Sequence, residues 1–295
     1  MNVYGTEQIR NVVLLGHGGA GKTTVAEAMA LITGVTKRMG KVADGNTISD
    51  YDKEEIKRQF SISTTLIPLE YQGENGPVKI NLLDTPGFFD FVGEVEEAIS
   101  VADAAIIVVN CKAGIEPGTE RAWEMCEKYN LPRLIFVTNM DDDHASYREL
   151  VVKLEKKFGR KIAPFQLPIR ENEKFVGFVN VVKMAGRRFT NLSDYVECEI
   201  PDYVQKNLTI ARDALIEAVA ETNEEYMERY FLGEEFTQEE ISGALRAHVI
   251  EGDIVPVMMG SGINCQGFKV LLQVIDKYFP APNHFECIGV DVSTG

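Results

Sequence analysis

Runs of apolar residues alternate along the chain with segments of helical periodicity. Continuous apolar runs are typical of strands buried on both faces, and they occupy residues 11–15, 104–110, 131–138 and 256–259. Segments with helical spacing cover residues 22–32, 89–102, 117–129, 145–158 and 268–278. The alternation predicts an α/β fold with a mostly parallel sheet flanked by helices.

Two earlier segments depart from this alternation. Residues 35–63 are polar and charged and lack a clear apolar period, which predicts a long mobile connection. Residues 64–71 and 78–83 predict the two strands of a hairpin, and the second strand ends at Asp84. This hairpin is therefore expected to supply a strand of the central sheet.

The pattern changes again in the second half of the chain. A short strand is predicted over 164–169, and the stretch that follows it no longer alternates strand with helix. We predict an α+β inserted subdomain over residues 171–253. Its expected elements are a hairpin over 175–182 and 187–190 and acidic helices over 203–220 and 238–249.

The domain organisation follows from this insertion. Residues 1–170 and 254–282 are predicted to form the main domain, interrupted by the subdomain of residues 171–253. Residues 283–295 begin what looks like another strand. We expect them to start a second domain that the chain does not complete.

Net charge, apolar runs and cysteine spacing exclude several classes of function. The chain has 295 residues and a formal net charge of -15 at pH 7, which argues against independent DNA binding. It has no apolar run long enough for a membrane span and no signal segment at its start. We expect a cytoplasmic protein with free thiols and neither disulfide nor zinc, because five cysteines are scattered without pairing or metal spacing: Cys111, Cys126, Cys198, Cys265 and Cys287.

The first candidate site is a glycine-rich loop between the predicted strand over 11–15 and the helix over 22–32. The segment from Gly16 to Thr24 fits the pattern Gly-x-x-x-x-Gly-Lys-[Ser/Thr] of a phosphate-binding loop. Its backbone amides and the helix amino terminus favour phosphate, Lys22 is expected to reach the outer phosphates, and Thr23 is expected to ligate magnesium. The predicted nucleotide-binding residues here are His17, Gly18, Gly19, Ala20, Gly21, Lys22, Thr23 and Thr24. We expect the side chain of His17 to pack the loop.

Two further polar segments follow predicted strands. Asp84-Thr85-Pro86-Gly87 places an aspartate where it can hold magnesium and a glycine amide where it can sense the outermost phosphate. The segment over 138–143 also follows a strand, at the edge where open α/β sheets bind ligands. An aspartate there can accept hydrogen bonds from the N1 and N2 nitrogens of guanine. A solvated acidic helix cap is the alternative interpretation.

Taken together, these residues resemble the N-terminal GTP-binding part of translation elongation factor G and its paralogues. The likeness runs from the phosphate loop through Asp84-Thr85-Pro86-Gly87 to Gly260-Ser261-Gly262. Residues 171–253 resemble the insert of that family, which ordinary small GTPases lack. The resemblance implies a phosphate-loop NTPase G domain that binds GTP or GDP with Mg2+, is monomeric, and acts on the ribosome through its full-length parent.

The resemblance also assigns residues. Ser61, within Arg58-Gln59-Phe60-Ser61-Ile62-Ser63, falls on the magnesium-binding threonine of the first switch, so the implied metal set is Thr23, Ser61 and Asp84. The implied guanine motif holds Asn139 and Asp141, and a register one residue later would instead use Asn139 and Asp142. Ser261 and Gly262 fall on the guanine-facing turn.

Two departures from the family bear on activity. Phe88 occupies the place of the histidine that positions the attacking water, and a phenylalanine side chain can neither donate nor accept a hydrogen bond. Gly19 stands where the family has an aspartate. We expect attenuated GTP hydrolysis by a translational GTPase. The alternatives are a nucleotide-dependent binding switch with negligible hydrolysis and, less favoured, an ATPase.

Overall fold

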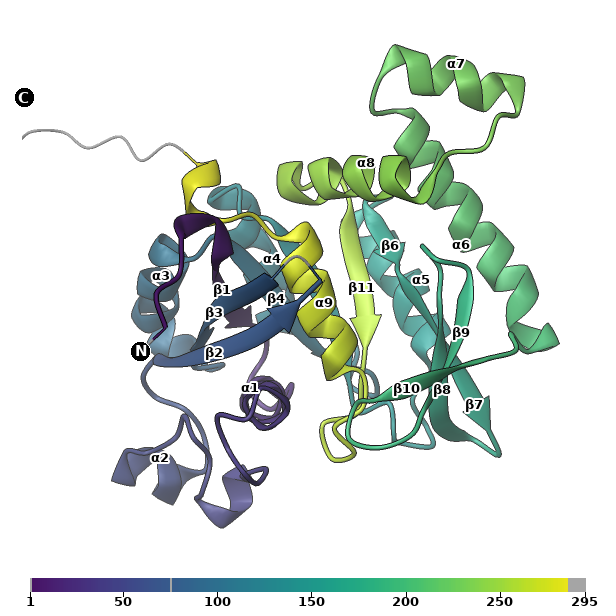
Figure 1. Cartoon of the computed structure of the whole chain (residues 1–295). Coiled ribbons are helices and arrows are strands. Elements are labelled where there is room, and N and C mark those ends of the chain that lie inside the picture. Colours follow the sequence, from purple (N-terminus) through teal and green to yellow (C-terminus); the bar gives the residue numbers. More distant parts are fainter. Residues whose placement is uncertain (1, 75, 286–295) are drawn as a thin grey trace, which may run out of the picture.

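The computed structural model describes residues 2–74 and 76–285, which build a central seven-stranded sheet (Figure 1). The strand order is β2-β3-β1-β4-β5-β11-β6, and every neighbouring pair is parallel except β2 with β3. The predicted mostly parallel α/β sheet is therefore confirmed. Its strands are β1 (Ile9–Leu15), β2 (Thr65–Gly73), β3 (Gly76–Asp84), β4 (Ala104–Asn110), β5 (Arg133–Thr138), β6 (Ile162–Pro164) and β11 (Val255–Met259).

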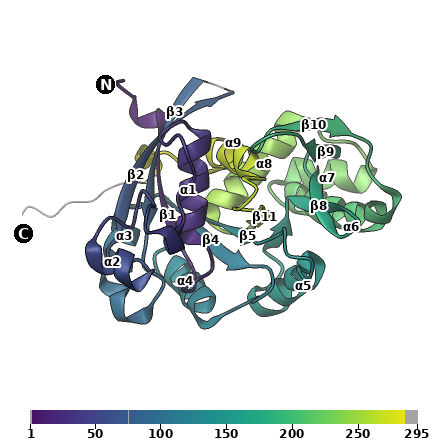
Figure 2. The same ribbon diagram turned by 90° about the horizontal axis from the view of Figure 1, so that it is seen from below.

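Helices cover both faces of this sheet. The contacting pair α1 and α9 lies on one side, and α3, α4 and α5 lie on the other (Figure 2). The predicted segments agree with these helices to within a few residues, and the predicted helix over 89–102 begins with a 3-10 turn, η3 (Phe89–Phe91). The bounds are α1 (Lys22–Ile32), α3 (Val92–Val101), α4 (Pro117–Lys128), α5 (Tyr147–Phe158) and α9 (Phe268–Tyr278).

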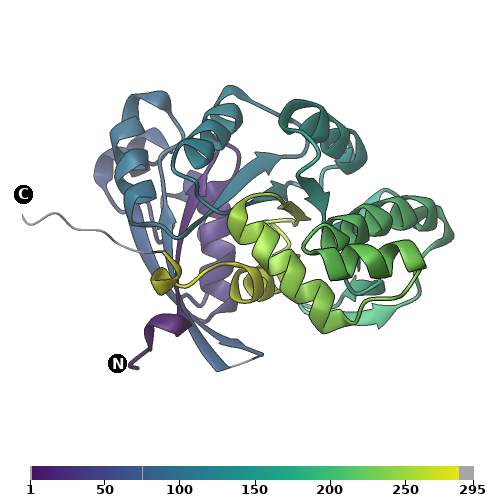
Figure 3. The ribbon, with the colours of Figure 1, turned by 90° about the horizontal axis from the view of Figure 1, so that it is seen from above.

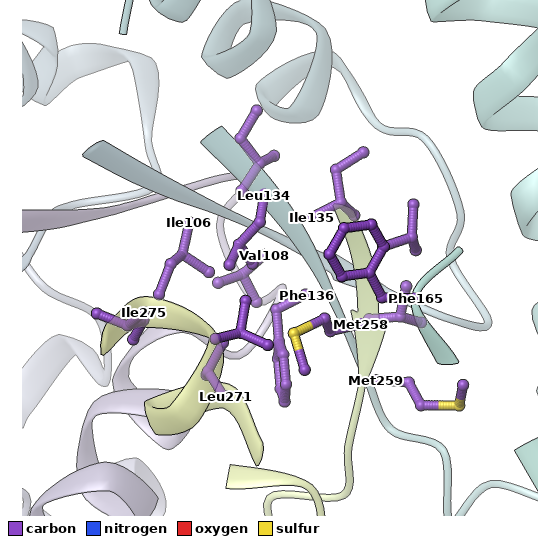
Figure 4. Close-up of a cluster of buried hydrophobic side chains, with 14 of the residues drawn as sticks. Ile106, Val108, Leu134, Ile135, Phe136, Phe165, Met258, Met259, Leu271 and Ile275 are labelled. Atoms are coloured by element: carbon purple, nitrogen blue, oxygen red, sulfur yellow. The ribbon is translucent and has the colours of Figure 1, made fainter. Parts of the chain in front are cut away.

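The core covers both faces of the main sheet, and Figure 4 shows the part of it between the central strands and α9. Every residue of β5 and β11 is buried, as the continuous apolar runs predicted. The rings of Phe136 on β5 and Phe268 on α9 have their centroids 5.2 Å apart. Because β1, β3, β4, β5 and β11 are parallel, their carboxyl ends lie along one edge of the sheet, where the loops that follow them emerge.

A second, antiparallel sheet and three helices lie between β6 and β11 in the sequence. The strand order is β10-β9-β8-β7, and the helices α6 to α8 gather on one side of the molecule (Figure 3). The predicted hairpin and the two predicted acidic helices are present, whereas β10 and α7 were not predicted. The bounds are β7 (Gln166–Glu171), β8 (Lys174–Asn180), β9 (Ala185–Phe189), β10 (Tyr195–Cys198), α6 (Asp202–Ala220), α7 (Glu224–Leu232) and α8 (Gln238–Glu251).

The strand predicted over 164–169 corresponds to β7 for residues 166–169, but its first residue, Pro164, belongs to β6 of the main sheet. The chain forms β6 in the main sheet and then β7 in the second sheet, because Phe165 turns between them. Its backbone nitrogen donates to Val257 of β11, and its carbonyl accepts from Val181 just past β8. The division of the chain into a main domain and an inserted subdomain stays a prediction.

The connection over residues 35–63 contains more structure than expected. It forms a 3-10 turn, η2 (Val42–Asp44), and a helix, α2 (Lys53–Arg58). Two buried carboxylates hold it: Glu27 of α1 accepts from the backbone nitrogens of Gly40 and Ile48, and Glu55 of α2 accepts from those of Ile62 and Ser63. Buried carboxylates therefore order this connection. Glu55 belongs to the polar segment that suggested mobility, and Glu27 belongs to α1.

A 3-10 turn lies near each end of the described chain, η1 (Thr6–Gln8) and η4 (Pro282–His284). The predicted start of a second domain falls mostly on residues 286–295, which lie outside the described residues. Within the described part of the chain, the helices are too short or too polar to cross a membrane.

The helix α8 provides a test of acid stability. Glu240 accepts from the backbone nitrogen of Thr237 at 2.7 Å and pairs with Arg229 at 2.7 Å, and the Arg229 bond is the main cause that lowers the pKa of Glu240 from 4.5 to about 2. The lowered pKa makes this contribution complete above the unfolded value of 4.5 and lost as the pH falls towards 2. Glu240→Gln is therefore expected to lower the melting temperature above pH 5 and to match the wild type increasingly below it. Thermal unfolding across this range, with Glu239→Gln as the control, checks the prediction; a difference independent of pH would contradict it.

Candidate functional site

The phosphate-loop sequence forms a tight turn between β1 and α1. Gly16, Gly19 and Gly21 have φ values of 137°, 82° and 100°, which side chains rarely adopt. Gly21 directly precedes the first residue of α1, so the loop leads into the helix amino terminus. Backbone N–H groups and the helix dipole there favour an anion. The local structure is thus the one that a phosphate-binding loop requires.

Lys22 lies buried at the start of α1. Its Nζ donates to the carbonyl oxygens of Gly16 at 2.9 Å and His17 at 3.0 Å. Burial lowers the pKa of Lys22 to about 8, and the nearby Asp84 carboxylate partly opposes this. A buried ammonium with neutral acceptors and one carboxylate nearby is suited to receive an additional anion.

The three predicted metal ligands converge. The hydroxyl of Thr23 donates to Oδ2 of Asp84 at 2.9 Å and lies 3.4 Å from the hydroxyl oxygen of Ser61. The other carboxylate oxygen of Asp84, Oδ1, is buried without a hydrogen-bond partner among the described residues. Hydroxyl and carboxylate oxygens are the ligands that Mg2+ prefers, so the residues present fit this ion.

Asp84 and a second carboxylate share this end of the site. Burial raises the pKa of Asp84 to about 6, against the lowering effect of the nearby Ser49 hydroxyl, of Lys22 and of Thr23. Asp50, which the sequence did not single out, is also buried and accepts from the Ser61 hydroxyl at 2.7 Å. Asp50 and Ser61 both line a cavity of about 230 Å³ along the phosphate loop. The role of Asp50 lacks a sequence signal, because it depends on how residues 35–63 fold back.

Gly87 and Phe88 lie against the outer side of the phosphate loop. A Cβ at Gly87 would lie 2.5 Å from Nζ of Lys22 and 2.6 Å from Cα of Gly18, so the strand-end turn touches the phosphate loop. The Phe88 ring lies over Gly18 and packs on Phe60, with ring centroids 4.7 Å apart. Phe88 nevertheless stays 43% exposed. An apolar ring, rather than a hydrogen-bonding group, therefore stands at the predicted position of the water-orienting side chain.

His17 takes the packing role expected of its side chain. The backbone nitrogen of Gly118, in the first turn of α4, donates to its Nδ1 at 3.3 Å, and its Nε2 lies 3.6 Å from Glu116. These contacts hold the imidazole against α4. The phosphate loop is thereby fixed to a helix on the opposite face from α9.

The predicted guanine motif is connected directly to the phosphate loop. The hydroxyl of Thr138, the last residue of β5, donates to the carbonyl of Ala20 at 2.8 Å. The backbone nitrogen of Met140 donates to the carbonyl of Gly260 at 3.3 Å. Arg170 of β7 donates to the carbonyl of Met140 at 2.8 Å. Three strands thus position this loop, and Thr138 takes a structural role that the predicted residue set omitted.

The two candidate aspartates differ in their partners. Asp142 pairs with Lys112 at 3.2 Å and accepts from the backbone nitrogen of His144 at 2.8 Å, and these bonds lower its pKa. Asp141 has neither an ion pair nor a side-chain hydrogen bond within the described residues. Asn139, at φ 59°, is exposed. The geometry leaves Asp141 available to a ligand and engages Asp142 in the protein, which supports the register with Asn139 and Asp141 over the later one.

The turn after β11 lies beside the phosphate loop. A Cβ at Gly262 would clash with Cγ2 of Thr24, so the turn touches the first turn of α1. Ser261 is fully buried, and its hydroxyl accepts from the backbone nitrogen of Asn264 at 3.3 Å. The residues predicted to face guanine and those predicted to hold phosphate therefore meet at one edge of the sheet.

Comparisons with known proteins agree with this geometry. The family described as the elongation factor Tu GTP binding domain matches residues 7–281. Elongation factor G of Neorickettsia sennetsu is 37% identical over 281 residues, covering 94% of this chain and 40% of that protein. A crystal structure of a protein from Thermus thermophilus is similar with a TM-score of 0.87 and 37% identity, covering 95% of this chain and 41% of that one.

Both relatives are longer than this chain. It spans about two fifths of the length of these two relatives. Both likenesses cover nearly all of the chain. The chain belongs to the family of elongation factor Tu GTP-binding domains, and its predicted resemblance to elongation factor G is confirmed.

Proposed function

We propose that this chain is the nucleotide-binding part of an elongation factor G-like translational GTPase, which binds GTP or GDP with Mg2+ and acts on the ribosome through its full-length parent. One observation carries the proposal. Lys22 and Thr23 line the cavity along the glycine-rich loop together with Ser61 of a separate segment, and Asp84 at the end of β3 accepts from the Thr23 hydroxyl. Family membership supports guanine as the base.

The chemistry expected of this arrangement is positioning and charge neutralisation. Phosphate oxygens would receive the loop amides and the Lys22 ammonium, and Thr23, Ser61 and Asp84 would hold the metal. Bound Mg2+ would supply positive charge to the outer phosphates. The Gly87 amide, adjacent to Lys22, is suited to report whether the outermost phosphate is present. These residues therefore support a ligand-dependent switch as well as hydrolysis.

A nucleotide-dependent switch with negligible hydrolysis is the second candidate, and Phe88 is the observation for it. The family comparisons do not favour this alternative, since they place the chain among elongation factor GTP-binding domains. Both candidates require nucleotide binding, and they differ in turnover with ribosomes.

Nucleotide affinity tests the shared part of the proposal. Titration with a fluorescent GDP analogue is expected to give saturable binding that weakens when Mg2+ is chelated. GTP and GDP should displace the analogue, whereas ATP should not. Displacement by ATP at the same concentrations as GDP would contradict the choice of guanine and favour the ATPase alternative.

Asp141→Asn tests the guanine contact. A carboxylate can accept from both N1 and N2 of guanine, whereas an amide offers one acceptor and one opposed donor. Since hydrogen bonds to charged groups contribute about 1.5–3 kcal/mol, GDP affinity is expected to fall by at least about tenfold. Asp142→Asn is the matched control and should leave GDP affinity nearly unchanged. The reverse result would show that the later register, with Asn139 and Asp142, is used.

A further inference from the structure

An apolar cavity of about 440 Å³ lies between the helices α5 and α6, over the strands β6 and β7. Its volume is within the range of small-molecule sites. The cavity shares none of its lining residues with the cavity along the phosphate loop. It is therefore separate from the proposed nucleotide site.

Aliphatic side chains form most of the wall of this cavity. The lining positions on α6 recur three or four residues apart, so they share one face of that helix. Two of the aliphatic residues, Val152 of α5 and Ile210 of α6, are 56% and 60% exposed and lie at the mouth of the cavity. An alkyl chain bound here would remove this apolar surface from water, which is favourable. The wall includes Val151, Val152, Leu167, Val204, Ile210 and Leu215.

Three arginines line the cavity without a carboxylate partner. Arg148, Arg160 and Arg170 form no ion pair within the described residues. The guanidinium of Arg170 donates instead to three backbone carbonyls, which leave its charge unneutralised. The side chains of Arg148 and Arg160 are exposed, so they can reach a ligand in the cavity.

Glu155 of α5 is the carboxylate that lines the same cavity. It has neither an ion pair nor a side-chain hydrogen bond in the part of the chain that the structure describes, and burial raises its pKa. A surplus of two positive charges remains when Glu155 is counted as ionised. This surplus is local, because the whole chain carries a net charge of -15.

The arginines are distributed unevenly along the cavity. The Arg170 guanidinium donates to the carbonyl of Ala145, just before α5, and the Arg170 backbone nitrogen donates to the hydroxyl of Tyr203, in the first turn of α6, at 2.8 Å. Arg148 lies in the first turn of α5, so it shares this end with Arg170. Arg160 follows the last turn of α5 and lies at the opposite end, because a helix of 12 residues is about 18 Å long.

We propose that this cavity binds a small amphipathic monoanion, an alkyl chain of medium length that carries one carboxylate. The carboxylate faces Arg148 and Arg170 at the start of α5. It also accepts from Asn207, whose half-buried amide has no hydrogen-bond partner among the described residues. The alkyl chain lies along the aliphatic wall towards Arg160. The proposal does not depend on nucleotide binding.

Isothermal titration calorimetry with decanoate below its micellar concentration tests the site. The chain is expected to bind one equivalent. Decyltrimethylammonium has the same alkyl chain with the opposite charge and should bind at least about tenfold more weakly. Butyrate keeps the carboxylate but is six methylene groups shorter, so it should bind at least about 100-fold more weakly.

Substitutions in the lining test the two parts of the ligand. Arg148→Gln should weaken decanoate binding at least about tenfold, because a charge-assisted hydrogen bond is lost. Val152→Asp places a carboxylate at the apolar mouth and should cause a loss of similar size. Glu155→Gln removes a like charge and should strengthen binding. Lys156→Gln, exposed on α5 but outside the lining, is the matched control and should change nothing.

The outcomes also separate the two cavities and the two ends of this one. Decanoate should still bind to Lys22→Ala, in which the phosphate loop lacks its ammonium, and Arg160→Gln should lose less affinity than Arg148→Gln. Circular dichroism confirms that each variant is folded. The proposal is overturned if decanoate does not bind, if either comparison compound binds as tightly, if Lys22→Ala abolishes binding, if Arg160→Gln causes the larger loss, or if folded Arg148→Gln and Val152→Asp bind like the wild type.

Discussion

Phe88→His in the full-length parent is expected to accelerate ribosome-stimulated GTP hydrolysis. Phenylalanine cannot orient a water molecule, whereas an imidazole can both donate and accept a hydrogen bond. Side chains that manage a proton or orient the nucleophile contribute about 10²–10⁴-fold to enzymatic rates, and the expected gain lies in that range. Single-turnover hydrolysis with saturating ribosomes measures it.

The geometry around Phe88 makes this substitution feasible. The ring is 43% exposed and its main aromatic partner is Phe60, with ring centroids 4.7 Å apart. Losing an aromatic pair costs about 0.5–1.5 kcal/mol, which a folded domain tolerates. The smaller imidazole would occupy the same place beside Gly18 and Gly87. Nucleotide affinity is therefore expected to change little, and the effect should appear in the hydrolysis step.

Phe88→Leu is the control for this experiment. Leucine also removes the aromatic pair but provides no hydrogen-bonding group, so its rate should equal that of the wild type. Equal rates for the wild type and Phe88→His would refute the idea that Phe88 limits hydrolysis. A fast wild-type rate would show that another residue orients the water and would remove the support for a non-hydrolysing switch.

The elements of the main sheet could be predicted because their signals are local. Strands such as β4 and β11 are buried on both faces and read as continuous apolar runs, and the helix α9 shows a clear apolar period. The short strands β6 and β7 could not be separated by such signals. Only one residue divides them, and the assignment of β6 to the main sheet depends on its pairing with β11, which is distant in sequence, whereas β7 pairs with the neighbouring β8.

Some residues of the candidate site could likewise be predicted from local sequence signals, and others could not. The phosphate loop and Asp84 follow from short motifs whose chemistry depends on neighbouring backbone. Asp50 and Thr138 depend on tertiary contacts instead: Asp50 reaches the site through its bond with Ser61, and Thr138 through its bond with Ala20. Likewise, Glu27 and Glu55 appear along the chain as ordinary helix residues. Their role as acceptors for the connection over 35–63 is visible only in the folded chain.

Lys22→Met is expected to remove most nucleotide binding while leaving the nucleotide-free fold intact. The lysine is 6% exposed and its ammonium donates to two loop carbonyls, so methionine loses these bonds but also removes the cost of burying a charge. The two effects oppose each other, and the stability of the nucleotide-free chain should change by no more than about 1 kcal/mol. The proposed contact between the Lys22 ammonium and the outer phosphates of the nucleotide would be lost, and methionine has no group that replaces it.

The expected loss of GDP affinity is at least about 100-fold, because Lys22 would make charge-assisted hydrogen bonds to more than one phosphate oxygen, each contributing about 1.5–3 kcal/mol. Thermal unfolding with and without GDP and Mg2+ separates the two effects. A ligand at about 100 times its Kd stabilises the native state by about 2.7 kcal/mol, so the wild type should melt at a clearly higher temperature with GDP. Lys22→Met should show almost no such shift, while Lys153→Met, an exposed control on α5, should shift like the wild type. A full GDP-dependent shift in Lys22→Met would mean that the glycine-rich loop binds nucleotide without its lysine, or that the nucleotide binds elsewhere.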